Sequence, residues 1–233
     1  TNVLRTLNVT APLIAAWDFT GPGNVATFAA TIFNANLSSS NLITRGAGAA
    51  ASVGANSFRT IGFQNNGIST ANTDYFETTL SAASGKTLNI SDITAKFNGT
   101  GTYYAGAGVT SQFAYSLDGT NFTLIGSPVS ITSANLQSSA PIDVSGISAL
   151  QNVPSGTTVT IRYYASGQTG TGGWGFFSSA VGDYGLTFGG SISTLPPTAT
   201  YTKTNVSACN NTTSDGTITV TAAGGTPPYN YTW

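Results

Sequence analysis

The sequence predicts an all-β protein built as a β-sandwich or jelly roll, and three observations support this prediction. Apolar and polar residues alternate with a period of two in several segments, most clearly at residues 111–117 and 157–165. The 233 residues include 12 Phe, 10 Tyr and 3 Trp, together with much Thr, Val and Ile, the types that favour strands. No amphipathic run of helical length is present, and glycine-rich turns separate the short apolar runs.

The alternation and the turn signals define a series of short strands. They lie at residues 13–19, 58–63, 75–80, 88–97, 111–117, 122–125, 141–144, 157–165 and 184–192. Leu88 and Ile93 would face opposite sides of a regular strand, so we expect a β-bulge near Asp92. The Asp-Gly pair at residues 118–119 lies between two strands and predicts a hairpin turn.

Two adjacent prolines indicate a connector at residues 196–198, because proline cannot pair in a central strand and stiffens a linker. Residues 13–195 have the size of one large β-sandwich. Residues 1–12 are either its first strand or an arm. Residues 199–233 can hardly bury a core by themselves, so we expect further chain or a partner to complete their fold.

Composition excludes several classes of function. Only 6% of the residues are charged, no His is present, and Cys209 is the single Cys. The usual zinc, copper and haem sites and a Ser-His or Cys-His nucleophile pair are therefore excluded. The seven Lys and Arg form no basic stripe, which argues against a nucleic-acid partner, and the longest near-apolar run, residues 11–17, cannot span a bilayer. A weakly charged surface rich in Thr, Ser, Asn and Gly indicates a secreted or cell-surface protein.

The eight carboxylates do not indicate an enzyme. Asp74 and Glu77 are three residues apart and would face opposite sides of a strand, whereas a glycosidase needs two carboxylates across one cleft. We therefore predict no catalytic residue and no cofactor. A structural calcium ion could bind Asp18 or Asp183 with backbone carbonyls. The alternative is that these carboxylates are solvated or cap turns.

Aromatic side chains provide candidate platforms against which a sugar ring could stack. Tyr164 is out of phase with the apolar Ile161 and Tyr163, so we expect its ring to point outward. Trp174 lies in the glycine-rich residues 170–175 and is either a loop-mounted platform or a plug in one end of the core. Further aromatic candidates are Tyr103, Tyr104, Phe176, Phe177 and Tyr184. Surface glycans are accordingly one predicted partner.

The N-terminal segment offers a route to self-association. Val3, Leu7 and Val9 give residues 1–16 a strand-forming pattern, and addition of a strand to an open edge can produce polymers. If residues 199–233 accept this arm from another copy, the chain forms a fibre end to end. The alternative is that the chain is one piece of a longer protein.

Three motifs fill the C-terminal part: TKTNVSAC at residues 202–209, SDGTITV at 214–220 and GGTPPYNYTW at 224–233. Together they resemble the first half of the SprB-type repeat, which occurs in gliding-motility adhesins and other surface proteins of Bacteroidota. The resemblance implies a partial immunoglobulin-like repeat at residues 199–233. It also implies that Cys209 lacks the second Cys found near the end of the family's repeat. The alternative is a generic immunoglobulin-like repeat.

The large domain carries a second resemblance, through motifs at residues 16–19, 74–77, 115–122, 160–165 and 173–176. In this order they resemble jelly-roll modules of secreted Bacteroidota proteins, often exported by the type IX system. Such modules share their fold with carbohydrate-binding modules and occur in adhesins and multidomain enzymes alike. We therefore predict a non-enzymatic extracellular adhesin or fibre-forming subunit, and the alternative is a carbohydrate-binding module of a secreted multidomain hydrolase.

Overall fold

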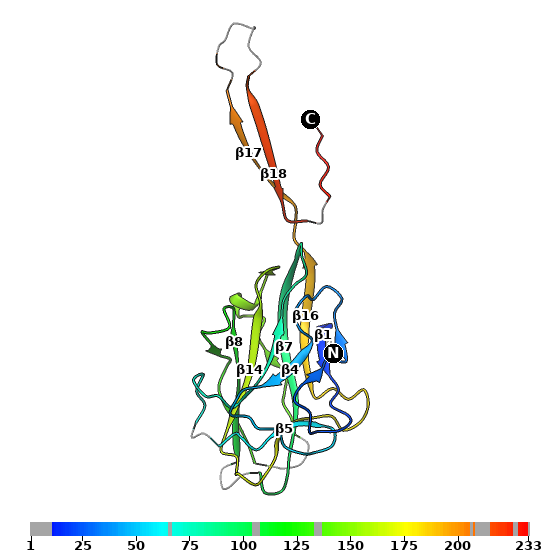
Figure 1. Ribbon diagram of the computed structural model, residues 1–233, viewed down its shortest axis with the longest axis vertical. Helices are drawn as coiled ribbons and strands as arrows, with labels where there is room; N and C mark the ends of the chain where they lie inside the picture. The colour runs from blue at the N-terminus through cyan, green and yellow to red at the C-terminus, as the bar shows by residue number, and fades with distance from the viewer. Residues whose placement is uncertain are drawn as a thin grey trace, which may run out of the picture.

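The computed structural model describes residues 11–64, 67–103, 108–132, 137–205, 207, 215–225 and 228–232. Over these ranges every regular element is a strand except one short 3-10 turn, η1 (Ser148–Leu150). All strand pairs are antiparallel, and two sheets pack face to face with an extended hairpin beyond them (Figure 1). The prediction of an all-β sandwich is confirmed.

Nine strands of the described chain form the first sheet, in the order β3-β1-β16-β7-β15-β5, with β11, β12 and β13 paired to β7. Their bounds are β1 Leu13–Trp17, β3 Ile32–Phe33, β5 Ser57–Thr60, β7 Lys86–Gly99, β11 Gln137–Ser138, β12 Ile142–Asp143, β13 Val153–Pro154, β15 Trp174–Phe177 and β16 Leu186–Thr194. The long strand β7 is the centre of this sheet, because β16 and β15 pair along one side and three short strands along the other.

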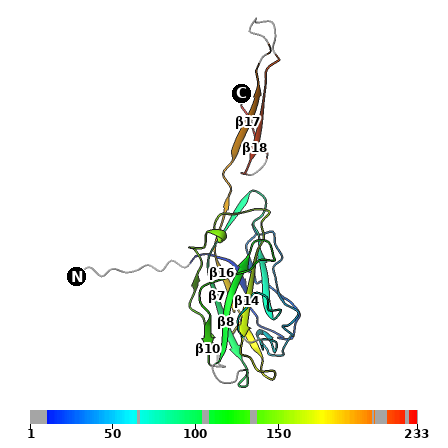
Figure 2. The ribbon, with the colours of Figure 1, turned by 90° about the vertical axis from the view of Figure 1, so that its left-hand side faces the viewer.

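Seven strands of the described chain form the second sheet, in the order β10-β8-β14-β6-β4-β2, with β9 also paired to β8. Their bounds are β2 Phe28–Ala29, β4 Leu42–Arg45, β6 Tyr75–Leu80, β8 Val109–Ser116, β9 Thr123–Leu124, β10 Val129–Ile131 and β14 Val159–Ser166. The remaining pair, β17 (Thr198–Thr204) and β18 (Thr217–Ala223), forms a separate two-stranded hairpin that projects from one end of the sandwich (Figure 2). The strand β17 therefore begins inside the predicted connector.

Several sequence predictions are confirmed at the level of single residues. Gly189 of β16 pairs with Asp92, but Gly190 pairs with Ile90, so Ser91 is the extra residue of the predicted bulge. β8 and β9 pair across the predicted Asp-Gly turn, where Gly119 adopts a φ of 73°. The sandwich strands that were not predicted are β15, in a segment interpreted as a loop or a core plug, and the short strands β2, β3, β4, β10, β11 and β13.

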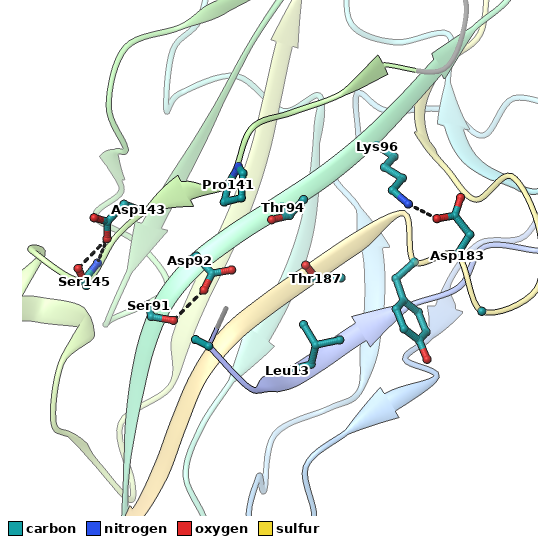
Figure 3. A pocket seen from close by; sticks show the side chains of 13 residues that line it. Leu13, Ser91, Asp92, Thr94, Lys96, Pro141, Asp143, Ser145, Asp183 and Thr187 are labelled. Atoms are coloured by element: carbon teal, nitrogen blue, oxygen red, sulfur yellow. Dashed lines mark hydrogen bonds and ion pairs between the residues drawn. The ribbon is translucent and has the colours of Figure 1, made fainter. Parts of the chain in front are cut away.

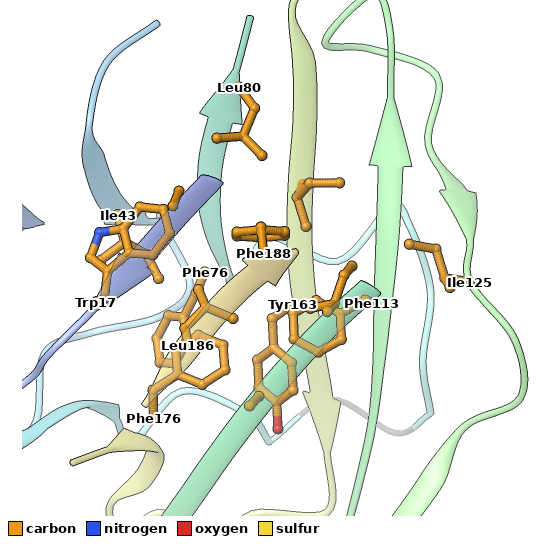
Figure 4. Packing of buried hydrophobic residues seen from close by; sticks show 14 of the residues in the cluster. Trp17, Ile43, Phe76, Leu80, Phe113, Ile125, Tyr163, Phe176, Leu186 and Phe188 are labelled. Carbon is orange, nitrogen blue, oxygen red and sulfur yellow. The ribbon is translucent and has the colours of Figure 1, made fainter. Parts of the chain in front are cut away.

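Aromatic rings from both sheets fill the core (Figure 4). The Tyr163 ring of β14 lies 5.2 Å from Phe97 and 5.0 Å from Phe176 of the opposite sheet, and Phe76 of β6 lies 5.5 Å from Phe176. Alternation along each strand produces this layer, since Tyr163 faces inward while its neighbours in sequence face outward. Such edge and stacked contacts add to the area that the rings bury.

Arg45 closes one lateral edge of the sandwich. This residue of β4 donates from Nε and Nη2 to the carbonyl oxygen of Arg59 on β5, at 3.2 and 2.9 Å, and from Nη1 to Val25. Its guanidinium lies 3.5 Å from the centre of the Phe58 ring. The side chain thus joins the second sheet to the first at the β4 and β5 edge.

Candidate binding surfaces

Tyr164 does not present its ring to solvent, and the prediction that it points outward as a platform is wrong. The phase argument was correct, because Tyr164 lies on the face of β14 opposite to the core residue Tyr163. However, the loop around Thr70 covers this face, and the Tyr164 hydroxyl donates to the Thr70 carbonyl oxygen at 3.2 Å. The ring packs 5.8 Å from Tyr75, and the residue is fully buried.

Trp174 is also fully buried, so the loop-mounted platform is wrong for this residue and the core plug is what the structure contains. Trp174 begins β15 and pairs with Gly99 of β7. A Cβ at Gly99 would lie 2.9 Å from the indole, so glycine is needed there for the ring to pack. The indole stacks at 4.7 Å on Tyr103 and at 5.6 Å on Phe97. Neither predicted stacking residue is accessible to a sugar in this conformation.

The predicted pairing arm, Val3, Leu7 and Val9, lies outside the described residues, and so do Tyr104 and Cys209. The part of the N-terminal segment from Leu13 onward is β1, which pairs with β16 on one side and β3 on the other. Only residues before β1 therefore remain as a donor strand for another copy.

An open groove of about 1050 Å³ crosses the outer face of the first sheet (Figure 3). Thr94 and Lys96 of β7 line it because they alternate with the core residues of that strand, and Thr187 of β16 lies beside them. Leu13 and Tyr184 contribute apolar surface. Tyr184 is the predicted stacking candidate that lines this accessible groove.

The bulge in β7 shapes the middle of the groove. Because Ser91 is the extra residue, Ser91 and Asp92 both line the groove, and the Ser91 hydroxyl donates to Asp92 Oδ2 at 2.8 Å. On the neighbouring strand Gly189 leaves room for this carboxylate, since a Cβ there would overlap Asp92 Oδ2. Asp143 of β12 pairs directly with Asp92 and also lines the groove. The groove thus combines carboxylate and hydroxyl groups with the apolar surface of Leu13 and Tyr184.

At the other end of the groove Lys96 forms an ion pair with Asp183, each side chain being about a quarter exposed. The Lys96 ammonium, followed by bonds from Ser179, lowers the pKa of the Asp183 carboxyl to about 2. The Asp183 carboxyl is therefore ionised at neutral pH.

Most described carboxylates have hydrogen-bonding roles in turns. Asp118 accepts from the backbone amides of Thr120 and Asn121 at 2.8 and 2.7 Å. Asp18, one candidate calcium ligand, accepts from the amides of Thr20 and Gly182 at 3.0 and 2.6 Å. Within the described ranges no three acidic or Cys side chains group closely enough to hold a metal ion. Calcium binding by Asp18 or Asp183 stays a prediction.

The β17 and β18 hairpin has two chemically different faces. The register pairs Tyr201 with Val220 and Lys203 with Ile218, so that one face is mostly apolar. The opposite face is a ladder of threonines: Thr198, Thr200, Thr202, Thr204, Thr217, Thr219 and Thr221. On the apolar face Tyr201 is 70% and Ile218 is 60% exposed. An isolated two-stranded hairpin is marginally stable in water, so this face needs a cover.

Comparison with known proteins gives one match, and it covers the hairpin region. No curated protein and no solved structure matches the chain. Within the described residues, no helix is long and apolar enough to cross a membrane. The sequence model of one family, the SprB repeat, does match, and this repeat is non-catalytic and consistent with an adhesin-like protein at the cell surface. Residues 200–233 therefore carry a SprB-type repeat sequence, as their three motifs predicted.

Proposed function

We propose that this chain is a non-catalytic, secreted building block of a bacterial cell surface, acting as an adhesin or a fibre-forming subunit of a Bacteroidota species. The observation that carries the proposal is the SprB repeat match over the exposed hairpin. The low charge of the chain supports association through backbone pairing and apolar contact, which depend little on salt.

Self-association would proceed by strand addition at the hairpin. The apolar face is open at Tyr201 and Ile218, with Val220 half-buried between them. Within the described part of the chain, each strand of the hairpin pairs along one edge only. The N-terminal segment of a second copy, with Val3, Leu7 and Val9, has the alternating pattern that could pair there and cover the apolar side chains. Because donor and acceptor lie on different surfaces, each added copy leaves a new acceptor free, and a filament results.

Electron microscopy and sedimentation of the purified chain test this proposal. Wild-type protein should form filaments in a concentration-dependent way. Deletion of residues 1–10, or the double change Tyr201→Ser and Ile218→Ser, should abolish them. The matched double change Thr200→Ser and Thr219→Ser on the opposite face should leave them intact. A wild-type chain that stays monomeric at high concentration, or filaments that survive the deletion, would refute strand addition.

Carbohydrate binding is the second candidate function, and the groove on the first sheet favours it. The groove contains an aromatic ring, Tyr184, and the carboxylates Asp92 and Asp143, which provide the apolar contact and the hydrogen-bond acceptors that a sugar with several hydroxyls needs. With Asp183 neutralised by Lys96, the groove suits a neutral or weakly basic glycan.

A glycan array separates this candidate from a purely structural role. Selective binding should be lost on Tyr184→Ala and weakened about tenfold on Asp92→Asn, since each removes a contact inside the groove. Tyr231→Ala and Asp215→Asn, which change similar residues outside the groove, should leave binding unchanged. If no glycan binds, or if the control variants lose binding equally, the groove is not a carbohydrate site.

A further inference from the structure

A second cavity lies between the two sheets, at the lateral edge opposite to the one that Arg45 closes. It measures about 520 Å³ and is bounded by β8 and β10 of the second sheet and by β7 and β12 of the first. This volume is within the usual range for small-molecule sites. The cavity opens between the sheets, whereas the groove lies on the outer face of the first sheet, and Pro141 borders both.

Apolar side chains form most of the wall of this inter-sheet cleft. They are Phe97, Phe113, Ile125, Val129, Ile131 and Ile142. Phe97, Phe113 and Ile125 are at most 4% exposed, so the cleft reaches the core itself. Apolar cavities of this kind do not hold water well, and an apolar molecule that fills one gains dispersion contacts with its walls.

No Asp, Glu, Lys or Arg is among the described residues that line the cleft. A charged ligand would lose its hydration without gaining a partner of opposite charge, which costs several kcal/mol. Serine hydroxyls, including Ser127 and Ser138, provide the polar atoms of the lining. The wall therefore selects for an uncharged ligand.

Gln112 borders the cleft but directs its side chain to the outer face of the second sheet, because it pairs there with Tyr164, whereas Phe113 faces the core. Its Nε2 donates to the carbonyl oxygens of Ile125 and Gly126 at 3.4 and 2.6 Å. The amide is thus used within the protein, and the inner wall of the cleft stays apolar.

We propose that the inter-sheet cleft binds an uncharged, largely hydrocarbon molecule. The ring or chain of the ligand lies between Phe97 and Phe113 on the inner side and Val129 and Ile131 near the edge strand. This site is a ligand site of the sandwich itself and does not depend on the hairpin or the groove.

Titration of the full chain with 1-naphthol, followed by methyl NMR of its isoleucines, tests the proposal. The methyls of Ile125, Ile131 and Ile142 should shift together, while those of the core residues Ile14 and Ile43 should not. The anion 1-naphthoate should bind at least about tenfold more weakly.

A matched pair of exposed valines supplies the control. Val129 is 58% exposed at the cleft and Val53 is 72% exposed in a loop elsewhere, so tryptophan at either position should be tolerated by the fold. Val129→Trp should fill the cleft and weaken naphthol binding about tenfold, and Val53→Trp should not. Absence of the three isoleucine shifts, equal affinity for naphthoate, or unchanged binding to Val129→Trp would each overturn the proposal.

Discussion

The Trp174 indole Nε1 donates a 3.0 Å hydrogen bond to the Tyr163 hydroxyl, and both residues are buried. The bond joins β15 of the first sheet to β14 of the second through the middle of the aromatic core. Burial raises the pKa of Tyr163, so its hydroxyl stays neutral over the whole working range of pH. Trp174 therefore has a structural role in the core.

Replacing either partner of this bond should destabilise the sandwich. Tyr163→Phe leaves the buried indole N–H without its acceptor, which costs about 1–3 kcal/mol. Trp174→Phe leaves the Tyr163 hydroxyl with Ser111 alone and opens a void, which costs a similar amount. The double variant should cost about 1 kcal/mol less than the sum of the two, as measured by urea unfolding. Tyr201→Phe, on the exposed hairpin, is the control and should change stability little. Strict additivity would show that the bond contributes nothing.

The same residues show what the sequence could and could not predict. The period of two placed Tyr163 in the core and Tyr164 on the other face, and both placements are confirmed. Tyr164 is nevertheless inaccessible because the carbonyl that covers it belongs to Thr70, 94 residues away. A strand pattern determines the face of a residue, but loops from elsewhere in the chain decide whether that face is exposed.

The groove illustrates a related limit. The phase slip near Asp92 predicted the bulge that places Ser91 and Asp92 in the groove. Asp143 pairs with Asp92, and Asp183 lines the far end of the same groove, but nothing local in the sequence indicates that these three residues share one groove. Their arrangement results from β12 and the loop before β16 meeting β7, and no single segment of the sequence encodes the order of strands in a sheet.

Arg45 joins β4 to β5, so its replacement should destabilise the sandwich at that edge. Burial lowers the pKa of Arg45 to about 10, so the group is still charged at pH 7, and its removal exposes the Arg59 carbonyl and the Phe58 ring. Arg45→Met should lower the free energy of unfolding by about 2 kcal/mol. Lys203→Met, which changes an exposed cation of the hairpin, should change the free energy of unfolding by less than about 0.5 kcal/mol. If both variants lower the free energy of unfolding equally, Arg45 does not stabilise the contact between the two sheets at this edge.

The Lys96 and Asp183 pair predicts a pH dependence. The pKa of Asp183 is about 2 in the folded chain and 3.8 for the free group, so the pair stabilises the fold above pH 4 and this contribution is lost as pH falls toward 2. Asp183→Asn should reduce stability by at most about 1 kcal/mol at pH 7, because the pair is partly exposed. The difference from wild type should shrink between pH 4 and 2 in thermal unfolding. Lys86→Met, whose ammonium bonds to the Thr194 hydroxyl, should show no such change.

Two glycines of the first sheet should differ in their tolerance of alanine. A Cβ at Gly175 would overlap the carbonyl oxygen of Phe58 and lie 2.9 Å from Arg59 Cα, both backbone atoms of the paired strand β5. A Cβ at Gly189 would meet only the carboxylate end of Asp92, which can rotate into the groove. Gly175→Ala should therefore cost about 3 kcal/mol or more and Gly189→Ala about 1 kcal/mol. Denaturant unfolding of the two variants measures both values, and the reverse order would contradict the close approach of β15 to β5.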